Sequence, residues 1–222
     1  MDYDLLWNLI SAISPILLLI GIIVGLKYIN YLAPSWRLIL AYLVVCLVVD
    51  LLYRYLGFYS HSKYNLFMIP IFGFLELSIF SVLYYKYIFQ NKSKSLLIFI
   101  VTILLLILYE VISTLKSSHK ESFHSYGKVV ADASIVFFCL IYYWRVVKGQ
   151  IPINSEYNFL NSVVFVYYSV NLLLYLPVNF LVNAKLTLVI FFWVVNLISM
   201  VLFYLILIYL IWQNGKTLKI SR

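Results

Sequence analysis

The chain has 222 residues, of which 65% are hydrophobic and only 11% are charged, and its formal net charge is +8. Soluble domains carry about 25% charged residues, so the polar side chains here are too few to cover a globule in water. The composition excludes an ordinary soluble domain and predicts one integral membrane domain.

Seven apolar runs are long enough to cross a bilayer as helices, because a span needs about 20 apolar residues. In chain order they cover residues 5–26, 38–58, 65–89, 96–115, 129–147, 159–181 and 186–212. The runs lack the alternation of a membrane β-barrel, and seven continuous apolar helices are too many for one small soluble core. The predicted fold is therefore all-α, a single-domain bundle of seven transmembrane helices.

Lysines and arginines between the runs predict the orientation, because cytoplasmic loops are enriched in them. One side carries ten basic residues and the other carries five, with Arg54 set aside because it lies inside a span. The ten are Lys27, Arg37, Lys86, Lys92, Lys94, Arg145, Lys148, Lys216, Lys219 and Arg222, and the five are Lys63, Lys116, Lys120, Lys128 and Lys185. We therefore expect the N-terminus outside and the C-terminus in the cytoplasm. The bases are scattered, which favours contact with anionic lipid and gives no sign of nucleic-acid binding.

Small residues share one face of the first span, at Ser11, Ser14, Gly21 and Gly25. Small side chains let transmembrane helices approach closely. This face predicts close packing inside the bundle, and a homo-oligomer is the second interpretation.

Five ionisable residues fall inside or just inside the predicted spans, where a charge is costly and usually functional. They are Asp50, Arg54, Glu76, Glu110 and Asp132. Asp50 and Arg54 are four residues apart on one helical face, so we expect them to pair, and a pair that only locks the bundle is one interpretation. Glu76 has no obvious base to pair with in its own span, so it is expected to act as a hydrogen-bond donor, a proton-linked switch or a general acid.

The ionisable residues gather in the predicted outer half of the bundle, with Glu76 near mid-membrane. Asn171 and Tyr175 in the sixth span, and Trp193 and Asn196 in the seventh, are expected to add polar and aromatic walls. A polar hollow of this kind is typical of a ligand pocket that opens to the outside. The alternative is a buried polar network that binds no ligand. The predicted pocket residues are Asp50, Arg54, Glu76, Glu110, Asp132, Asn171, Tyr175, Trp193 and Asn196.

Several seven-helix classes and cofactors are not supported by the sequence. A retinal protein needs a lysine in the middle of its last span, whereas Lys185 stands at the outer end. The histidines fall outside the spans, at His61, His119 and His124, with Glu121 between the last two. Zinc binding by that loop is an open alternative to plain solvation, but no helical zinc motif is present. We predict no metal, no retinal and no other cofactor.

The stretch Asn65-Leu66-Phe67-Met68-Ile69-Pro70-Ile71-Phe72-Gly73-Phe74-Leu75-Glu76, followed by Tyr84-Tyr85-Lys86, resembles the third span of small seven-helix bacterial proteins. Genes of that group often stand beside genes of sensor histidine kinases. The resemblance implies a membrane-embedded sensory or accessory component of the bacterial inner membrane. It carries over no catalytic residue.

The sequence favours a receptor-like sensor, which a small molecule or a proton would reach from outside. Its signal would pass to a partner protein that docks on Lys86, Lys92, Lys94, Lys216 and Lys219. The alternative is an intramembrane enzyme that acts on a lipid-like substrate with Glu76 and either Asp50 or Asp132 as general acid and base. A transporter or pore subunit is the third choice. It is less favoured because a transport path needs polar groups along its whole length, and the predicted inner half is largely aliphatic.

Overall fold

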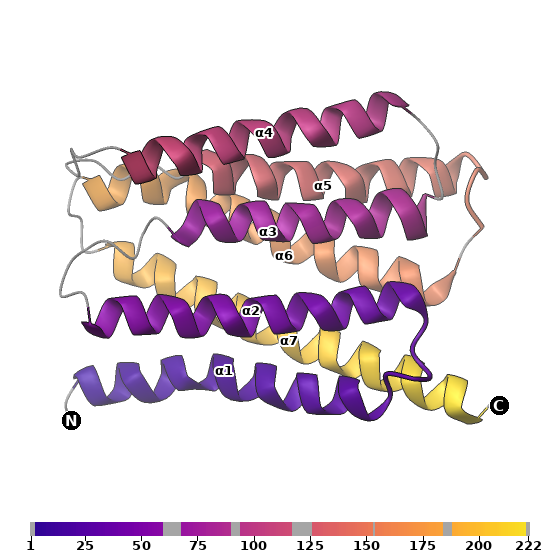
Figure 1. Cartoon of the computed structure of the whole chain (residues 1–222), viewed down its shortest axis with the longest axis horizontal. Helices are drawn as coiled ribbons and strands as arrows, with labels where there is room; N and C mark the ends of the chain where they lie inside the picture. Colours follow the sequence, from indigo (N-terminus) through magenta and orange to yellow (C-terminus); the bar gives the residue numbers. More distant parts are fainter. Residues whose placement is uncertain are drawn as a thin grey trace.

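The structure, a computed structural model, describes residues 3–59, 68–89, 94–116, 126–152, 154–183 and 188–220. Within these residues it contains helices and no strand (Figure 1). The helices are α1 (Tyr3–Lys27), α2 (Pro34–Tyr59), α3 (Met68–Val82), α4 (Lys94–Lys116), α5 (Tyr126–Val147), α6 (Ser155–Asn183) and α7 (Leu188–Ile220), and α3 continues into a π-helical segment, η2 (Leu83–Ile88). Six described helices are long and apolar enough to cross a membrane, and the apolar stretch Ala12–Lys27 of α1 is a shorter one. The predicted all-α bundle is confirmed, and its orientation stays a prediction.

Successive helices run in opposite directions, so the two termini lie at opposite ends of the bundle (Figure 1). We call the end where α1, α3, α5 and α7 begin the N-terminal end, and the end where α2, α4 and α6 begin the C-terminal end. In the packing order, α2 contacts α1, α3 and α7, while α5 contacts α3, α4 and α6. Since α3 contacts both α2 and α5, its side chains reach the interior of the bundle.

The exterior of the bundle is apolar, as lipid contact requires. Large apolar side chains such as Leu106, Leu173 and Phe191 are exposed, and Leu173 keeps 72% of its surface accessible. A soluble protein rarely exposes so large a continuous apolar surface. Together with the length of the helices, this surface indicates a multi-pass membrane protein.

Two of the small residues in the first span support helix packing inside the bundle. A Cβ atom on Gly21 would lie 2.6 Å from Cγ1 of Ile208 in α7, and one on Gly25 would collide with Leu40 in α2. Ser14 is also buried. The described part of this face therefore packs against α2 and α7 of the same chain.

The last helix is longer than predicted, since α7 ends at Ile220 whereas the apolar run ends at Trp212. The sequence beyond Trp212 becomes polar because it leaves the apolar layer, but it contains no proline that would end the helix. Gly215 allows this extension to pack on the turn that follows α1, because a Cβ there would lie 2.5 Å from Cβ of Tyr28.

Candidate functional site

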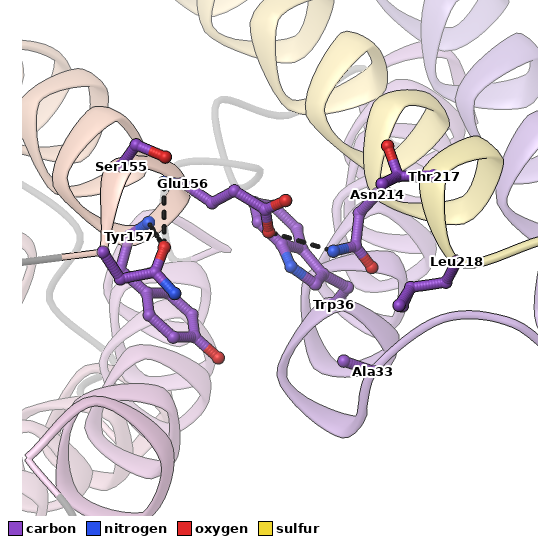
Figure 2. Close-up of a pocket in the computed structure, with 9 residues that line it drawn as sticks. Ala33, Trp36, Ser155, Glu156, Tyr157, Asn214, Thr217 and Leu218 are labelled. Atoms are coloured by element: carbon purple, nitrogen blue, oxygen red, sulfur yellow. Dashed lines mark hydrogen bonds between the residues drawn. The ribbon is translucent and has the colours of Figure 1, made fainter. Parts of the chain in front are cut away.

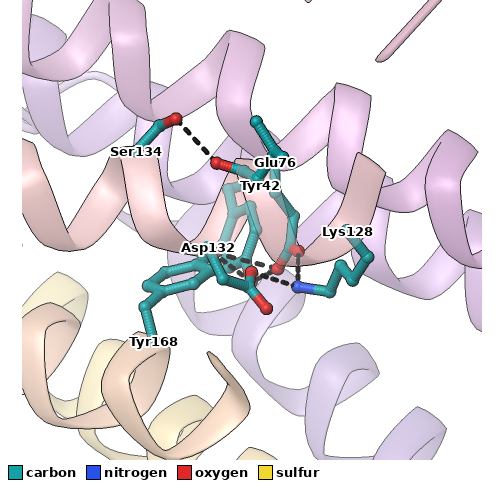
Figure 3. A network of polar contacts seen from close by, with 7 residues as sticks. Tyr42, Glu76, Lys128, Asp132, Ser134 and Tyr168 are labelled. Atoms are coloured by element: carbon teal, nitrogen blue, oxygen red, sulfur yellow. Dashed lines mark hydrogen bonds and ion pairs between the residues drawn. The ribbon is translucent and has the colours of Figure 1, made fainter. Parts of the chain in front are cut away.

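A buried cluster of charged and hydroxyl side chains lies in the interior of the bundle (Figure 3). Nζ of Lys128 lies 2.7 Å from Oε2 of Glu76 and 2.5 Å from Oδ1 of Asp132. The hydroxyl groups of Tyr42 and Tyr168 each donate a hydrogen bond to Oε1 of Glu76, at 2.9 Å. All five residues are at most 1% exposed. We call these five residues the buried charge cluster.

Glu76 connects α3 to three other helices through its carboxylate. Tyr42 belongs to α2, Lys128 to α5 and Tyr168 to α6, and each donates to this one group. Hydrogen bonds to a charged acceptor are about twice as strong as neutral ones. The charge of Glu76 therefore stabilises the packing of α2, α5 and α6 around α3.

A glycine permits the close approach that the cluster needs. Gly73 is one turn before Glu76, and a Cβ atom there would lie 3.1 Å from Cα of Lys128 and 3.3 Å from its Cδ. The bare backbone of Gly73 thus leaves room for α5 and for the Lys128 side chain. The lysine begins near the start of α5 and reaches inward to Glu76.

Aromatic rings surround the ammonium group of Lys128. Its Nζ lies 5.7 Å from the ring centroid of Phe72, 5.5 Å from that of Tyr168 and 5.3 Å from that of Tyr175. Aromatic faces attract cations at such distances. These rings compensate part of the cost of removing the charge from water, without offering it a solvent path.

The cluster contains more acceptors than donors, because two carboxylates face one ammonium group. Oδ2 of Asp132 is buried and accepts no hydrogen bond from the residues that the structure describes. A buried charge without a partner is costly. This arrangement is suited to taking up one proton, which would neutralise one carboxylate and leave a single ion pair.

Asp50 and Arg54 pair with each other in α2, as the sequence predicted. Nε of Arg54 lies 3.2 Å from both carboxylate oxygens of Asp50, and the two side chains keep 27% and 20% of their surface exposed. Asp50 stands two turns along α2 from Tyr42, so its carboxylate bonds within its own helix and not to Lys128. The predicted pocket is thus divided into a half-buried pair and a buried charge cluster.

Glu110 approaches the beginning of α5. A Cβ atom on Gly127 would lie 3.1 Å from Oε2 of Glu110. Glu110 as a whole is half-buried. Its position follows from that of α4, which packs against α3 and α5.

The predicted walls on α6 and α7 lie partly beside the cluster. Asn171 is buried on α6 between Tyr168 and Tyr175, and its Oδ1 accepts no hydrogen bond from any described residue. The Tyr175 ring is one of the three around Lys128. It packs edge-on against the Trp193 ring, with 6.3 Å between the two ring centroids. Asn196 is half-buried on α7, one turn beyond Trp193.

A second polar contact lies nearer the C-terminal end, where α3 has become η2. The Tyr84 hydroxyl donates to Oδ1 of Asn161 at 2.7 Å and lies 3.0 Å from Sγ of Cys139. All three residues are buried. The C-terminal half of the bundle therefore contains local buried polar contacts of its own.

Lys128, Tyr42 and Tyr168 were absent from the predicted pocket. Lys128 was counted as an outer-loop base, which is wrong, because it is 1% exposed inside the bundle. When Lys128 is removed from the five outer bases, ten basic residues on one side stand against four on the other, so the predicted orientation is unchanged. The spacing of Lys128 four residues before Asp132 was a usable signal, since such residues share a helical face.

The predicted docking lysines that the structure describes are exposed at the C-terminal end. Lys86 is on η2, Lys94 begins α4, and Lys216 and Lys219 are in the last turns of α7. Lys92 lies outside the described residues, as do His61, His119, Glu121 and His124, so the zinc interpretation of that loop stays a prediction.

No family model, no curated protein and no solved structure matches this chain. The resemblance of the third span to small bacterial seven-helix proteins therefore stays a prediction.

Proposed function

We propose that the chain is a receptor-like sensor of a bacterial inner membrane, and that the buried charge cluster is its switch. The observation that carries this proposal is the Glu76 carboxylate, which is 0% exposed and accepts bonds from three other helices. An ionisable group at this depth is costly and is usually retained for function.

Proton uptake is the signal that fits the composition of the cluster. A proton taken up by the pair of carboxylates, Glu76 and Asp132, lowers the negative charge that attracts the Lys128 ammonium and the hydroxyls of Tyr42 and Tyr168. Three contacts between helices weaken together, and the packing of α2, α5 and α6 around α3 shifts between two states. The titratable or charged groups that face Glu76 directly are Lys128, Asp132 and the two tyrosines. Cys46 of α2, Tyr167 and Tyr175 of α6 and Tyr204 of α7 are close by.

The signal leaves through the C-terminal end of the bundle in this proposal. Lys86, Lys94, Lys216 and Lys219 give that end a basic surface. A partner protein with an acidic surface is the class that such a surface attracts. With the N-terminus outside, this docking surface faces the cytoplasm.

A fluorescent label on α7 tests the proposal. Cys46 and Cys139 are buried, so a cysteine introduced as Lys219→Cys is labelled selectively with an environment-sensitive dye. We expect the emission of the reconstituted protein to change between neutral and acidic pH, and Glu76→Gln to abolish that change. Asp50→Asn, which also removes one carboxylate, keeps it. An unaltered response in folded Glu76→Gln protein would contradict the proposal.

The same variant separates this proposal from the enzyme alternative. A lipid-like substrate would have to reach Glu76 and Asp132, which are both 0% exposed, whereas a proton needs only a chain of polar groups. Lipid turnover by purified protein that disappears in Glu76→Gln would favour the enzyme. Solute flux into liposomes that disappears in the same variant would favour the transporter.

A further inference from the structure

A pocket of about 540 Å³ opens at the C-terminal end of the bundle (Figure 2). It lies between the connection from α1 to α2, the start of α6 and the end of α7. Trp36, Glu156, Tyr157 and Asn214 are among the residues that line it, and Glu156 is the one charged side chain among the lining residues that the structure describes. Its volume is within the range of small-molecule sites, about 300–1,000 Å³.

Asn214 lines this pocket, and its side chain holds an acceptor atom that no described residue satisfies. Its Nδ2 donates to Oε2 of Glu156 at 3.0 Å, and a carboxylate only accepts hydrogen bonds, so the orientation of the amide is fixed. The Asn214 side chain is 6% exposed, and its Oδ1 accepts no hydrogen bond from the described residues. A buried carbonyl oxygen of this kind requires a donor, because an unmade hydrogen bond is costly.

Glu156 adds a negative charge that its own helix stabilises. It lies in the first turn of α6, where the helix dipole favours an anion. The backbone N–H groups of Glu156 and Tyr157 already donate to Oδ1 of Asn154, at 2.9 and 3.3 Å. These amides are therefore engaged and do not offer an anion site, and the net charge that the described lining presents is the negative charge of Glu156.

We propose that this pocket binds a protonated primary amine. The ammonium group donates to Oδ1 of Asn214 and to the Glu156 carboxylate, and the rings of Trp36 and Tyr157 form an aromatic wall that attracts a cation. Two sources supply this chemistry, namely the ethanolamine head group of a phospholipid and a free alkylamine. The amine site is independent of the proton switch, because none of its described lining residues belongs to the buried charge cluster.

Isothermal titration calorimetry on the full chain in a maltoside detergent tests the proposal with three soluble probes. They are butylamine, glycerophosphoethanolamine and glycerophosphocholine. We expect both primary amines to bind, and the choline compound to bind at least about tenfold more weakly because its trimethylammonium group has no N–H donor. Tighter binding of glycerophosphoethanolamine than of butylamine assigns the site to a lipid head group, and the reverse assigns it to a free amine. Absence of amine binding, or equal affinity for the choline compound, overturns the proposal.

Two variants locate the binding at this pocket. Glu156→Gln keeps the shape of the side chain and removes the charge, and we expect at least about tenfold weaker amine binding. Asn214→Ala removes the second acceptor and weakens binding in the same direction, so it carries the test if Glu156→Gln does not fold. Glu110→Gln makes the same chemical change at the other end of the bundle and keeps the affinity of the original chain. Unchanged affinity in a folded pocket variant overturns the proposal.

Discussion

Lys128 and Glu76 are 52 residues apart in the sequence, yet Nζ of the lysine lies 2.7 Å from Oε2 of the glutamate inside the bundle. The lysine also bonds to Asp132 on its own helix. One ammonium group thus neutralises a carboxylate of α5 and connects α5 to α3. The stability of the bundle and its proposed response both depend on this contact.

Lys128→Met removes the only ammonium group of the cluster and leaves two buried carboxylates facing each other. Breaking a buried ion pair by removing one partner costs about 3–5 kcal/mol. We expect the free energy of unfolding, measured by titration with a denaturing detergent, to fall by that amount. The control is Lys216→Met, which removes an exposed lysine of α7. Equal losses in the two variants would show that Lys128 makes no special contribution.

Gly73→Ala places a methyl group between α3 and the backbone of α5. The new Cβ would lie 3.1 Å from Cα of Lys128, and a backbone atom moves only with its helix. We expect a loss of about 1–3 kcal/mol in thermal unfolding, as for other overpacked cores. Gly127→Ala is the matched control, because its Cβ would meet the flexible carboxylate of Glu110 and the Ile107 side chain. A loss of stability in Gly127→Ala as large as that in Gly73→Ala would contradict this prediction.

Tyr42→Phe and Tyr168→Phe each remove one hydrogen bond to Oε1 of Glu76. Each bond to a charged acceptor contributes about 1.5–3 kcal/mol. Because the two hydroxyls share this oxygen and lie 3.4 Å apart, we expect the double variant to differ from the sum of the single ones. Detergent unfolding of the three variants provides the comparison. Strictly additive costs would indicate that the two tyrosines do not share one acceptor.

Asp50→Asn tests whether the ion pair in α2 is separate from the cluster. Asp50 and Arg54 are both partly exposed, so an Arg54 without its partner has room to extend towards the membrane surface, and we expect a smaller cost than for a fully buried carboxylate left unpaired. We expect the unfolding free energy of Asp50→Asn to remain well above that of Lys128→Met. A larger loss in Asp50→Asn would place the main electrostatic contribution in α2.

The helices were predictable because a membrane span needs an unbroken run of apolar residues, and such a run can be recognised from the local sequence alone. Each predicted span overlaps one observed helix, and the largest difference, at the end of α7, arose where the helix leaves the apolar layer. The pairing of Asp50 with Arg54 was also predictable, since residues four apart share a helical face. The π-helical segment η2 was not predictable from hydropathy, because its sequence LYYKYI continues the span without a proline or glycine that would mark a change of helix type.

The composition of the site was only partly predictable, because it depends on which helices are neighbours. Glu76 and Asp132 were expected to approach each other, and Lys128 joins them. A lysine near a span end has the pattern of an orientation signal, and its inward reach depends on Gly73 in another helix. Tyr42 and Tyr168 are two of 21 tyrosines, and hydropathy does not distinguish a tyrosine that bonds to a carboxylate from one that faces lipid.

The central claim, that Glu76 and Lys128 form one buried ion pair between α3 and α5, is tested most directly by a double-mutant cycle. The unfolding free energies of Glu76→Gln, Lys128→Met and the double variant are compared with that of the original chain. We predict that the double variant loses less than the sum of the two single losses, with a coupling energy of about 1–3 kcal/mol. Additive losses, with a coupling energy near zero, would contradict the claim.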